Sequence, residues 1–394
     1  MCNANIMKQF LLVLLLTTIF SCKREKLSDE NTMQIVVNPI EGDIVLSEDK
    51  YFSDCNIIAL ESTDESLVSN INSVMYSKEF IAIFDLQIEQ LVLFNHRGEF
   101  IRRINRKGRG PQEYISISCV AIDESNRRFI IYDDMTERLI FYSYDGLYLG
   151  EQKHELLIDE MIVRDGNLYV TYHHTSKNHQ DWCGVIPLDG KSSTASVVLP
   201  FTTTQKTNYG MGGATVSINA DGVLVTQRFD NTIYEIKNST LTPKFTLDFG
   251  EYNIKKILEA TNETQLSRML SDYVYAIVNM VETDNYLAFT TNQGHPIIYD
   301  KHSRNVQVCA TLRIPGMPIS TSAIDPINNG YNKIMSVYDV SQLLKIKDLI
   351  KRHPEIKLEN EKIKNIIDNI DENSNPIIII YTIKKVSATE PPRI

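Results

Sequence analysis

The sequence lacks the motifs and the charge that mark several common functional classes. It has one tryptophan and six cysteines, and no CxxC pair or Cys/His spacing typical of zinc. Neither a GxSxG turn nor an HExxH helix is present, so no independent motif indicates an enzyme. Lysine and arginine total 40 against 50 aspartates and glutamates. Because nucleic-acid binders need a positive field, this balance argues against a nucleic-acid partner.

The longest apolar run is short and lies near the N-terminus. It reads FLLVLLL at residues 10–16 and leads through a small residue to Cys22. The run is too short for a permanent membrane helix, and its place before a cysteine is typical of a lipoprotein export signal. We therefore expect residues 1–21 to be cleaved, Cys22 to be lipidated, and residues 22–32 to be a tether. A secreted protein with a coincidental cysteine is the alternative.

The lipid would anchor the protein to a membrane of the bacterial cell envelope, and the sequence leaves open which side of the membrane it faces. Four further cysteines, Cys55, Cys119, Cys183 and Cys309, lie in apolar runs typical of strands. The envelope permits disulfides, but isolated cysteines in such runs are typical of buried thiols. We expect thiols at these four positions.

A repeated order of strands and turns predicts a β-propeller. An apolar strand at residues 80–85 is followed by a second at 90–95, a turn at 97–98 and a third at 100–104. The same order returns at residues 129–149 and, more loosely, three more times, and each copy is preceded by another strand. Four-stranded units at a spacing of about 40–60 residues are typical of propeller blades. A β-sandwich is the alternative, but it does not explain the regular return of the turns.

The two ends of the chain predict a sixth blade. Strands at residues 57–60 and 376–381 have no neighbouring partners, and pairing them would close the ring and remove exposed strand edges. We therefore predict an all-β fold, a six-bladed β-propeller with four-stranded antiparallel blades, over residues 33–394. Apolar residues at helical spacing predict short helical insertions near 253–272 and 341–370.

One loop carries a resemblance to a known family. The sequence KGRGPQEY at residues 107–114, with the Asp-Gly blade turns and the strand that ends at Glu61, resembles the six-bladed β-propeller lipoproteins of Bacteroidetes, which are NHL-like. Gln112 replaces a glycine usual in that family, and Asn375 and Pro376 before the last strand also fit it. The resemblance spans nearly all of the mature chain and implies fold and envelope location. It implies no catalytic residues, because the family's function is largely uncharacterised.

Propeller ligands usually bind on the face that collects the loops between blades and between second and third strands, which we call the loop face. The candidate ligand-binding residues there are Lys107, Arg109, Tyr114, His173, His174, His179, Arg228 and His295. The loop at residues 107–114 could present amides and cations to an anion, or could only turn the chain between blades. The three histidines near Asp181 could bind a metal, although their spacing fits no known motif.

Polar residues of the inner strands suggest a second kind of site. Some six-bladed propellers hold calcium in the central channel and hydrolyse lactones or related esters, and Asn72, Asn219, Asn279 and Glu282 are candidate ligands in this sequence. A shift of one residue in strand register would turn each of these side chains away. Our main hypothesis is a lipid-anchored binding or protein-interaction module for a glycan, a peptide or an envelope protein. A calcium-dependent, lactonase-like hydrolase is the alternative, and no other cofactor is predicted.

Overall fold

The structure is a computed structural model. It describes residues 32–40, 44–46, 51–172, 181–189, 196–200, 213–253, 269–313, 320–321, 325–327, 332–358 and 360–384. The chain divides into two compact units, Met1–Thr32 and Met33–Ile394, and the description below concerns the second.

In the described residues the strands form six sheets, each built around four antiparallel strands, which confirms the predicted six-bladed β-propeller. From the inner to the outer strand, blades 1 and 2 contain β4 (Ile71–Tyr76), β5 (Ile81–Asp85), β6 (Gln90–Phe94) and β7 (Phe100–Ile104), then β8 (Cys119–Asp123), β9 (Arg128–Asp133), β10 (Arg138–Ser143) and β11 (Tyr148–Lys153). In the same order, blades 3 and 4 contain β12 (Ile158–Arg164), β13 (Asn167–Tyr172), β14 (Asp181–Pro187) and β15 (Ser196–Pro200), then β16 (Val216–Ile218), β17 (Val223–Val225), β18 (Thr232–Lys237) and β19 (Thr240–Asp248).

Blades 5 and 6 complete the ring. They contain β20 (Ile277–Glu282), β21 (Tyr286–Thr291), β22 (Pro296–Asp300) and β23 (Val306–Arg313), with the short β24 (Ser320–Thr321) beside β23, then β25 (Asp325–Pro326), β26 (Lys333–Tyr338), β27 (Ile377–Ile383) and β3 (Phe52–Ala59). The second strands are mostly apolar, and every residue of β5 and β21 is buried. Outer strands such as β11 alternate between half-buried and exposed residues, because only one of their faces packs on the core.

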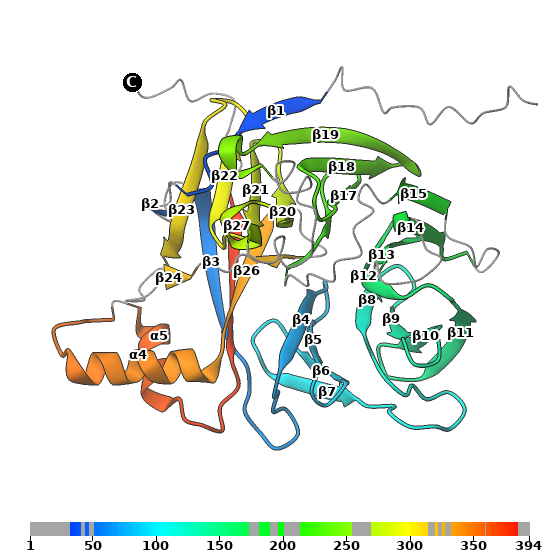
Figure 1. Ribbon diagram of the computed structural model, residues 1–394. Helices are drawn as coiled ribbons and strands as arrows, with labels where there is room; N and C mark the ends of the chain where they lie inside the picture. The colour runs from blue at the N-terminus through cyan, green and yellow to red at the C-terminus, as the bar shows by residue number, and fades with distance from the viewer. Residues whose placement is uncertain are drawn as a thin grey trace, which may run out of the picture. The chain divides into compact units, whose positions relative to one another are not determined.

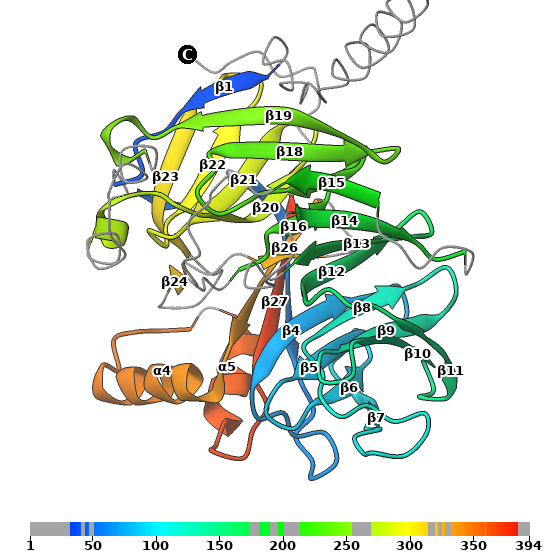
Figure 2. The same ribbon diagram turned by 45° about the vertical axis from the view of Figure 1, so that its right-hand side comes forward.

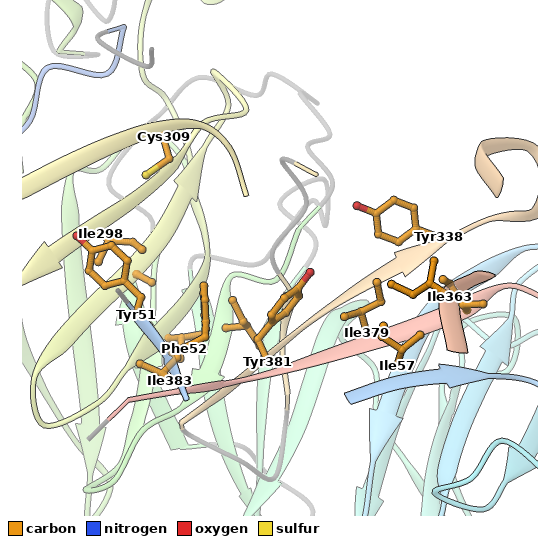
Figure 3. Close-up of a cluster of buried hydrophobic side chains, with 14 of the residues drawn as sticks. Tyr51, Phe52, Ile57, Ile298, Cys309, Tyr338, Ile363, Ile379, Tyr381 and Ile383 are labelled. Atoms are coloured by element: carbon orange, nitrogen blue, oxygen red, sulfur yellow. The ribbon is translucent and has the colours of Figure 1, made fainter. Parts of the chain in front are cut away.

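Strands from the two ends of the chain pair in blade 6, as predicted. β27 runs antiparallel to β3, with Ile379 opposite Ile57 and Ile378 opposite Ile58. Figure 1 shows the two strands side by side. Ile57, Ile379 and Ile383 join Tyr381 and residues of blade 5 in one apolar cluster (Figure 3). Ile58, Ile378 and Ile380 pack in a second cluster with residues of blade 1. Burial of these large side chains closes the ring.

The N-terminal segment adds two strands that the sequence pattern did not predict. β1 (Met33–Val36) pairs in parallel with β19, as Figure 2 shows, and β2 (Ile44–Leu46) pairs in parallel with β23. With β3, this segment therefore contributes an outermost strand to each of three blades.

Two helices lie between β26 and β27, within the predicted insertion at residues 341–370. Helix α4 (Val340–Arg352) begins with a capping box between Asp339 and Gln342, and α5 (Glu361–Asn369) follows it. Their apolar sides pack on the cluster beside blade 6. Of the other predicted insertion, near 253–272, only Asn253 and residues 269–272 are described. The 3-10 turn η2 (Gly250–Tyr252) precedes it, and the 3-10 turn η4 (Leu270–Asp272) lies at its end.

The cysteines in the described strands are thiols rather than disulfides. Cys119, Cys183 and Cys309 are buried, as predicted, and Cys55 is half-buried. Burial raises the pKa of the Cys119 thiol far above its ordinary value, which keeps it protonated and unreactive. Among the helices that the structure describes, none has the length and apolar character needed to cross a membrane.

Candidate functional site

The inner ends of all six blades surround a cavity of about 980 Å³. Ser69, Ser118, Asp159 and Gly213 line it at points where the chain enters an inner strand from the preceding blade. The start of α4 also lines it, and this helix is part of the connection between the second and third strands of blade 6. The cavity therefore lies at the loop-face end of the ring, and its volume suits a small ligand or one group of a larger one.

A chain of hydrogen bonds crosses from blade to blade along one side of the cavity. The Thr215 amide donates to Glu160 Oε2 at 2.8 Å, and the neighbouring Ala214 amide donates to Asn279 Oδ1 at 2.7 Å. Asn279 Nδ2 donates in turn to Asp325 Oδ1 at 3.0 Å. We call these five residues the channel arc. It joins blades 3, 4, 5 and 6 and holds a carboxylate at each end.

Irregularities in the inner strands aim these side chains. The pairing of β12 shifts register between Ile158 and Glu160, so the consecutive residues Asp159 and Glu160 both reach the cavity. The pairing of β20 shifts between Val278 and Val281, around Asn279. Such bulges re-aim side chains that regular alternation would turn away.

The backbone around Asn279 depends on residues that tolerate a left-handed conformation. Asn279 has φ +56° and Gly213 has φ +108°. A Cβ atom at Gly213 would lie 2.7 Å from Val278 Cγ2 and 3.1 Å from Asn279 Oδ1. Asparagine adopts this conformation more readily than most residues, and glycine avoids both the strain and the clash.

The polar part of the cavity is acidic. No lysine or arginine is among its described lining residues. Five carboxylate side chains line it: Asp159, Glu160, Asp325, Asp339 and Glu372. Burial raises the pKa of Glu160 to about 7, and the nearby charge of Asp159 adds to the rise. Burial also raises the pKa of Asp325, although the bond from Asn279 opposes it.

Neutral polar side chains, such as Asn72 and Ser118, and apolar side chains form the rest of the wall. The apolar side chains come from several blades and include Ile71, Val74, Met75, Val120, Met161, Met335, Val337 and Val340. The cavity is therefore amphipathic, with fixed carboxylates beside an aliphatic surface.

The loop at residues 107–114 is held by its own side chains. Tyr114 is fully buried, and its hydroxyl donates to the Glu89 carbonyl at 2.7 Å and accepts from the Arg106 amide at 3.1 Å. Burial raises its pKa to about 12. Tyr114 is thus a packing residue, and the expected ligand contact through its side chain is not compatible with this burial.

The cations and amides of that loop have partners within the protein or face solvent. Lys107 forms an ion pair with Glu89, and Arg109 is exposed. The Gly110 amide donates to Glu113 of the same loop at 2.7 Å. Neither Lys107 nor Arg109 is among the residues that line the cavity.

The remaining predicted residues fall in different places. The guanidinium of Arg228 lies 3.8 Å from Asp159 and 5.6 Å from the centre of a Trp182 ring, so Arg228 contacts the acidic part of the channel. His295 is half-buried in the turn between β21 and β22, away from the cavity lining. The histidines His173, His174 and His179 lie outside the described residues, as does Cys22.

The four candidate calcium ligands do not come together. Asn72 and Asn279 line the cavity, but Asn219 Nδ2 donates to Glu282 Oε2 at 2.7 Å. Lys244 and Lys301 each bind Glu282 at 2.6 Å. These ion pairs use the Glu282 carboxylate, so the predicted placement of Asn219 and Glu282 in the channel was wrong and the set does not fit calcium. No three His, Cys, Asp or Glu side chains gather at metal-binding distance in the described part of the chain.

Sequence reasoning did not single out Asp159, Glu160 or Asp325. Asp159 and Glu160 lie between Ile158 and Met161 in an otherwise strand-like run. Two consecutive acids within an inner strand were the sequence feature that could have indicated a site in the channel. Asp325 belongs to a strand of two residues, which is too short to show any alternation.

Together, the fold and the cavity define a six-bladed β-propeller with an acidic central channel. The chain belongs to the family described as "Domain of unknown function (DUF4934)", whose model matches residues 32–382. The comparison with curated proteins gives no match.

A solved structure of another protein has a similar fold. A predicted exported protein of Bacteroides fragilis NCTC 9343 is 18% identical to this chain, with a TM-score of 0.66 over 90% of this chain and 100% of that one. More distant similarities are to a member of the duf4221 family from Bacteroides vulgatus ATCC 8482, with 8% identity, 84% and 97% coverage and a TM-score of 0.46, and to BamB from Moraxella catarrhalis, with 12% identity, 65% and 64% coverage and a TM-score of 0.37.

Proposed function

We propose that this protein is a binding module of the bacterial cell envelope whose ligand site is the central channel. The observation that carries the proposal is the cavity of about 980 Å³, to which all six blades contribute. Hydrogen bonds between blades hold its polar groups in place before any ligand arrives, which lowers the entropic cost of binding. The ligand is a glycan, a peptide or an exposed segment of an envelope protein.

The envelope location rests on the N-terminal sequence. Residues 1–21 have the features of an export signal, and Cys22 follows its small cleavage residue. The description of the Bacteroides fragilis neighbour as exported supports this cellular location. In the proposal, lipid on Cys22 anchors the propeller to a membrane.

A calcium-dependent hydrolase has less support than a binding module. Two of its four candidate ligands, Asn219 and Glu282, bind each other, and two lysines neutralise Glu282.

A variant that blocks the channel tests the binding site. Asn72 is exposed and lines the cavity, so Asn72→Trp should narrow it without disturbing the apolar core. Val36→Trp is the matched control, because Val36 is 70% exposed on β1, at the outer edge of blade 4. Each variant is made in the mature chain with Cys22→Ser, which removes the lipid attachment site. The measurement is the change in its melting temperature when each member of a panel of envelope glycans and short peptides is added.

We expect compounds that stabilise the parent and Val36→Trp to lose their effect on Asn72→Trp. Equal stabilisation of both tryptophan variants would place the site outside the channel. Chemical turnover of a stabilising compound would contradict a role limited to binding.

A further inference from the structure

We infer that the group bound in the central channel is an aliphatic ammonium or guanidinium. This inference rests on the proposed function and names the ligand class for the same site. The inference rests on three features of the channel. Two carboxylates accept hydrogen bonds from uncharged donors, the described lining residues include no cation, and an aliphatic wall lies beside the carboxylates.

The carboxylates at the two ends of the channel arc accept hydrogen bonds from neutral groups. Glu160 accepts from the Thr215 amide, and Asp325 accepts from the side chain of Asn279. These donors orient the carboxylates without cancelling their charge. Arg228 lies near Asp159 rather than at either end of the channel arc. A cation entering the cavity would thus supply the missing charge.

The channel arc also fixes the positions of the two carboxylates. Glu160 belongs to blade 3 and Asp325 to blade 6, and both are held through backbone and amide groups. Because the arc spans four blades, its hydrogen bonds hold each carboxylate against a neighbouring blade. The site is therefore organised before binding, as charged recognition requires.

The apolar wall of the cavity constrains the rest of the ligand. Ile71, Val337 and Val340 line the same cavity, are only half-buried and offer an aliphatic surface. A methylene chain that carries a terminal cation would use both parts of the wall, as lysine-like side chains do at protein surfaces. A bare metal ion would leave the apolar wall uncovered, and an anion would be repelled by the carboxylates.

Isothermal titration of the mature Cys22→Ser chain with 1,5-diaminopentane tests the inference. Pentane-1,5-diol and glutarate, which share its carbon chain but are neutral and anionic, are the matched probes. We expect the diamine to bind and the diol to bind at least about tenfold more weakly, because charged hydrogen bonds contribute more than neutral ones. Glutarate should give no heat of binding.

Variants test the two carboxylates. Glu160→Gln and Asp325→Asn should each weaken diamine binding about tenfold, because each removes one charge and keeps the side-chain shape. Glu99→Gln is the control, since Glu99 is exposed in the turn between β6 and β7, away from the cavity. It should leave the affinity unchanged.

Every outcome decides between named alternatives. Equal binding of diamine and diol, no binding of the diamine, or unchanged affinity in both Glu160→Gln and Asp325→Asn would overturn the inference. If a neutral or anionic compound binds instead and Asn72→Trp abolishes its binding, the ligand class is wrong and the channel site stands. Diamine binding that Asn72→Trp leaves intact would overturn the channel site as well.

A further titration separates the two sources of such a cation. A short lysine-containing peptide with blocked ends carries the same group attached to a backbone. Tighter binding of this peptide than of the diamine would identify peptides as the source of the cation, and tighter binding of the diamine would identify free amines.

Discussion

Asn279 donates a side-chain hydrogen bond to Asp325 across 3.0 Å, from blade 5 to blade 6. The same residue also exchanges hydrogen bonds with Ala214, where the chain enters blade 4. One asparagine thus connects three blades at the channel, and it does so from a left-handed backbone conformation with φ +56°.

Asn279→Ala should reduce the free energy of unfolding by about 2–3 kcal/mol, since it removes two partly buried side-chain hydrogen bonds and strains the left-handed backbone. Asn279→Gly removes the same hydrogen bonds but tolerates this φ, so it should cost less than the alanine variant. Urea unfolding of both variants measures the difference. Equal losses would mean that the left-handed conformation contributes nothing to the effect.

Glu160→Gln should change the pH dependence of stability. The pKa of Glu160 is about 7 in the folded protein and 4.5 for an ordinary glutamate, so between these pH values the folded state binds more protons than the unfolded state. Stability therefore falls as pH rises through this window. At pH 8 the glutamine variant should be more stable than the parent by on the order of 2 kcal/mol, and at pH 4 the two should be equal.

Urea titrations at several pH values measure this effect. Glu251→Gln is the control, because Glu251 is exposed. A parallel pH dependence in the parent and Glu160→Gln would show that Glu160 does not titrate as expected.

Removal of residues 375–394 should abolish cooperative unfolding. The deletion removes β27 and exposes the apolar side of β3, which carries Ile57 and Ile58. A chain that ends at Lys384 keeps β27 and is the control. Thermal melts followed by circular dichroism measure the outcome, and an unchanged, cooperative melt of the shorter chain would contradict the closure of the ring through β27.

Asn375→Ala should destabilise the fold by roughly 2–4 kcal/mol, since three hydrogen bonds of a buried side chain are lost. Asn375 is 2% exposed, and its side chain accepts from the Val68 amide and donates to the carbonyls of Glu61 and Ser66. Asn373→Ala is the matched control, because Asn373 is exposed in the same turn. Similar urea midpoints for the two variants would contradict this role for Asn375.

Cys22→Ser should abolish lipidation. Cells that express the full chain and grow with a clickable palmitate analogue should label the parent and leave the serine variant unlabelled. The variant should also move from the membrane fraction to the soluble fraction. Label that persists in Cys22→Ser would show that the acylation site lies elsewhere.

The strand repeat was predictable because each blade is a local unit. Strands such as β5 and β6 are joined by short turns, so their apolar pattern and turn residues are neighbours in the sequence. The pairing of β3 with β27 was predictable for another reason, since two apolar strands without partners need each other. β1 and β2 are short strands in parallel pairs with distant segments, and no local pattern reveals such a pairing.

The site was harder to predict than the fold. Whether an inner-strand residue faces the channel depends on the bulges in β12 and β20, and a bulge shifts the alternation that sequence reasoning relies on. This is why Asn279 was placed correctly and Glu282, three residues later in the same strand, was not. Asn375 was singled out only through the family resemblance. In the structure its side chain bonds Glu61 and Val68, and it thereby joins the C-terminal part of the chain to the N-terminal part.

The pairing of β1, β2 and β3 with later segments sets an order of events during synthesis. These strands leave the ribosome first, but their partners β19, β23 and β27 are made much later. The backbone edges of the first strands therefore stay unpaired at first, and the ring closes only after β27 has been made. Folding is expected to be slow and to finish in one late step, during which a chaperone that shields strand edges would raise the yield.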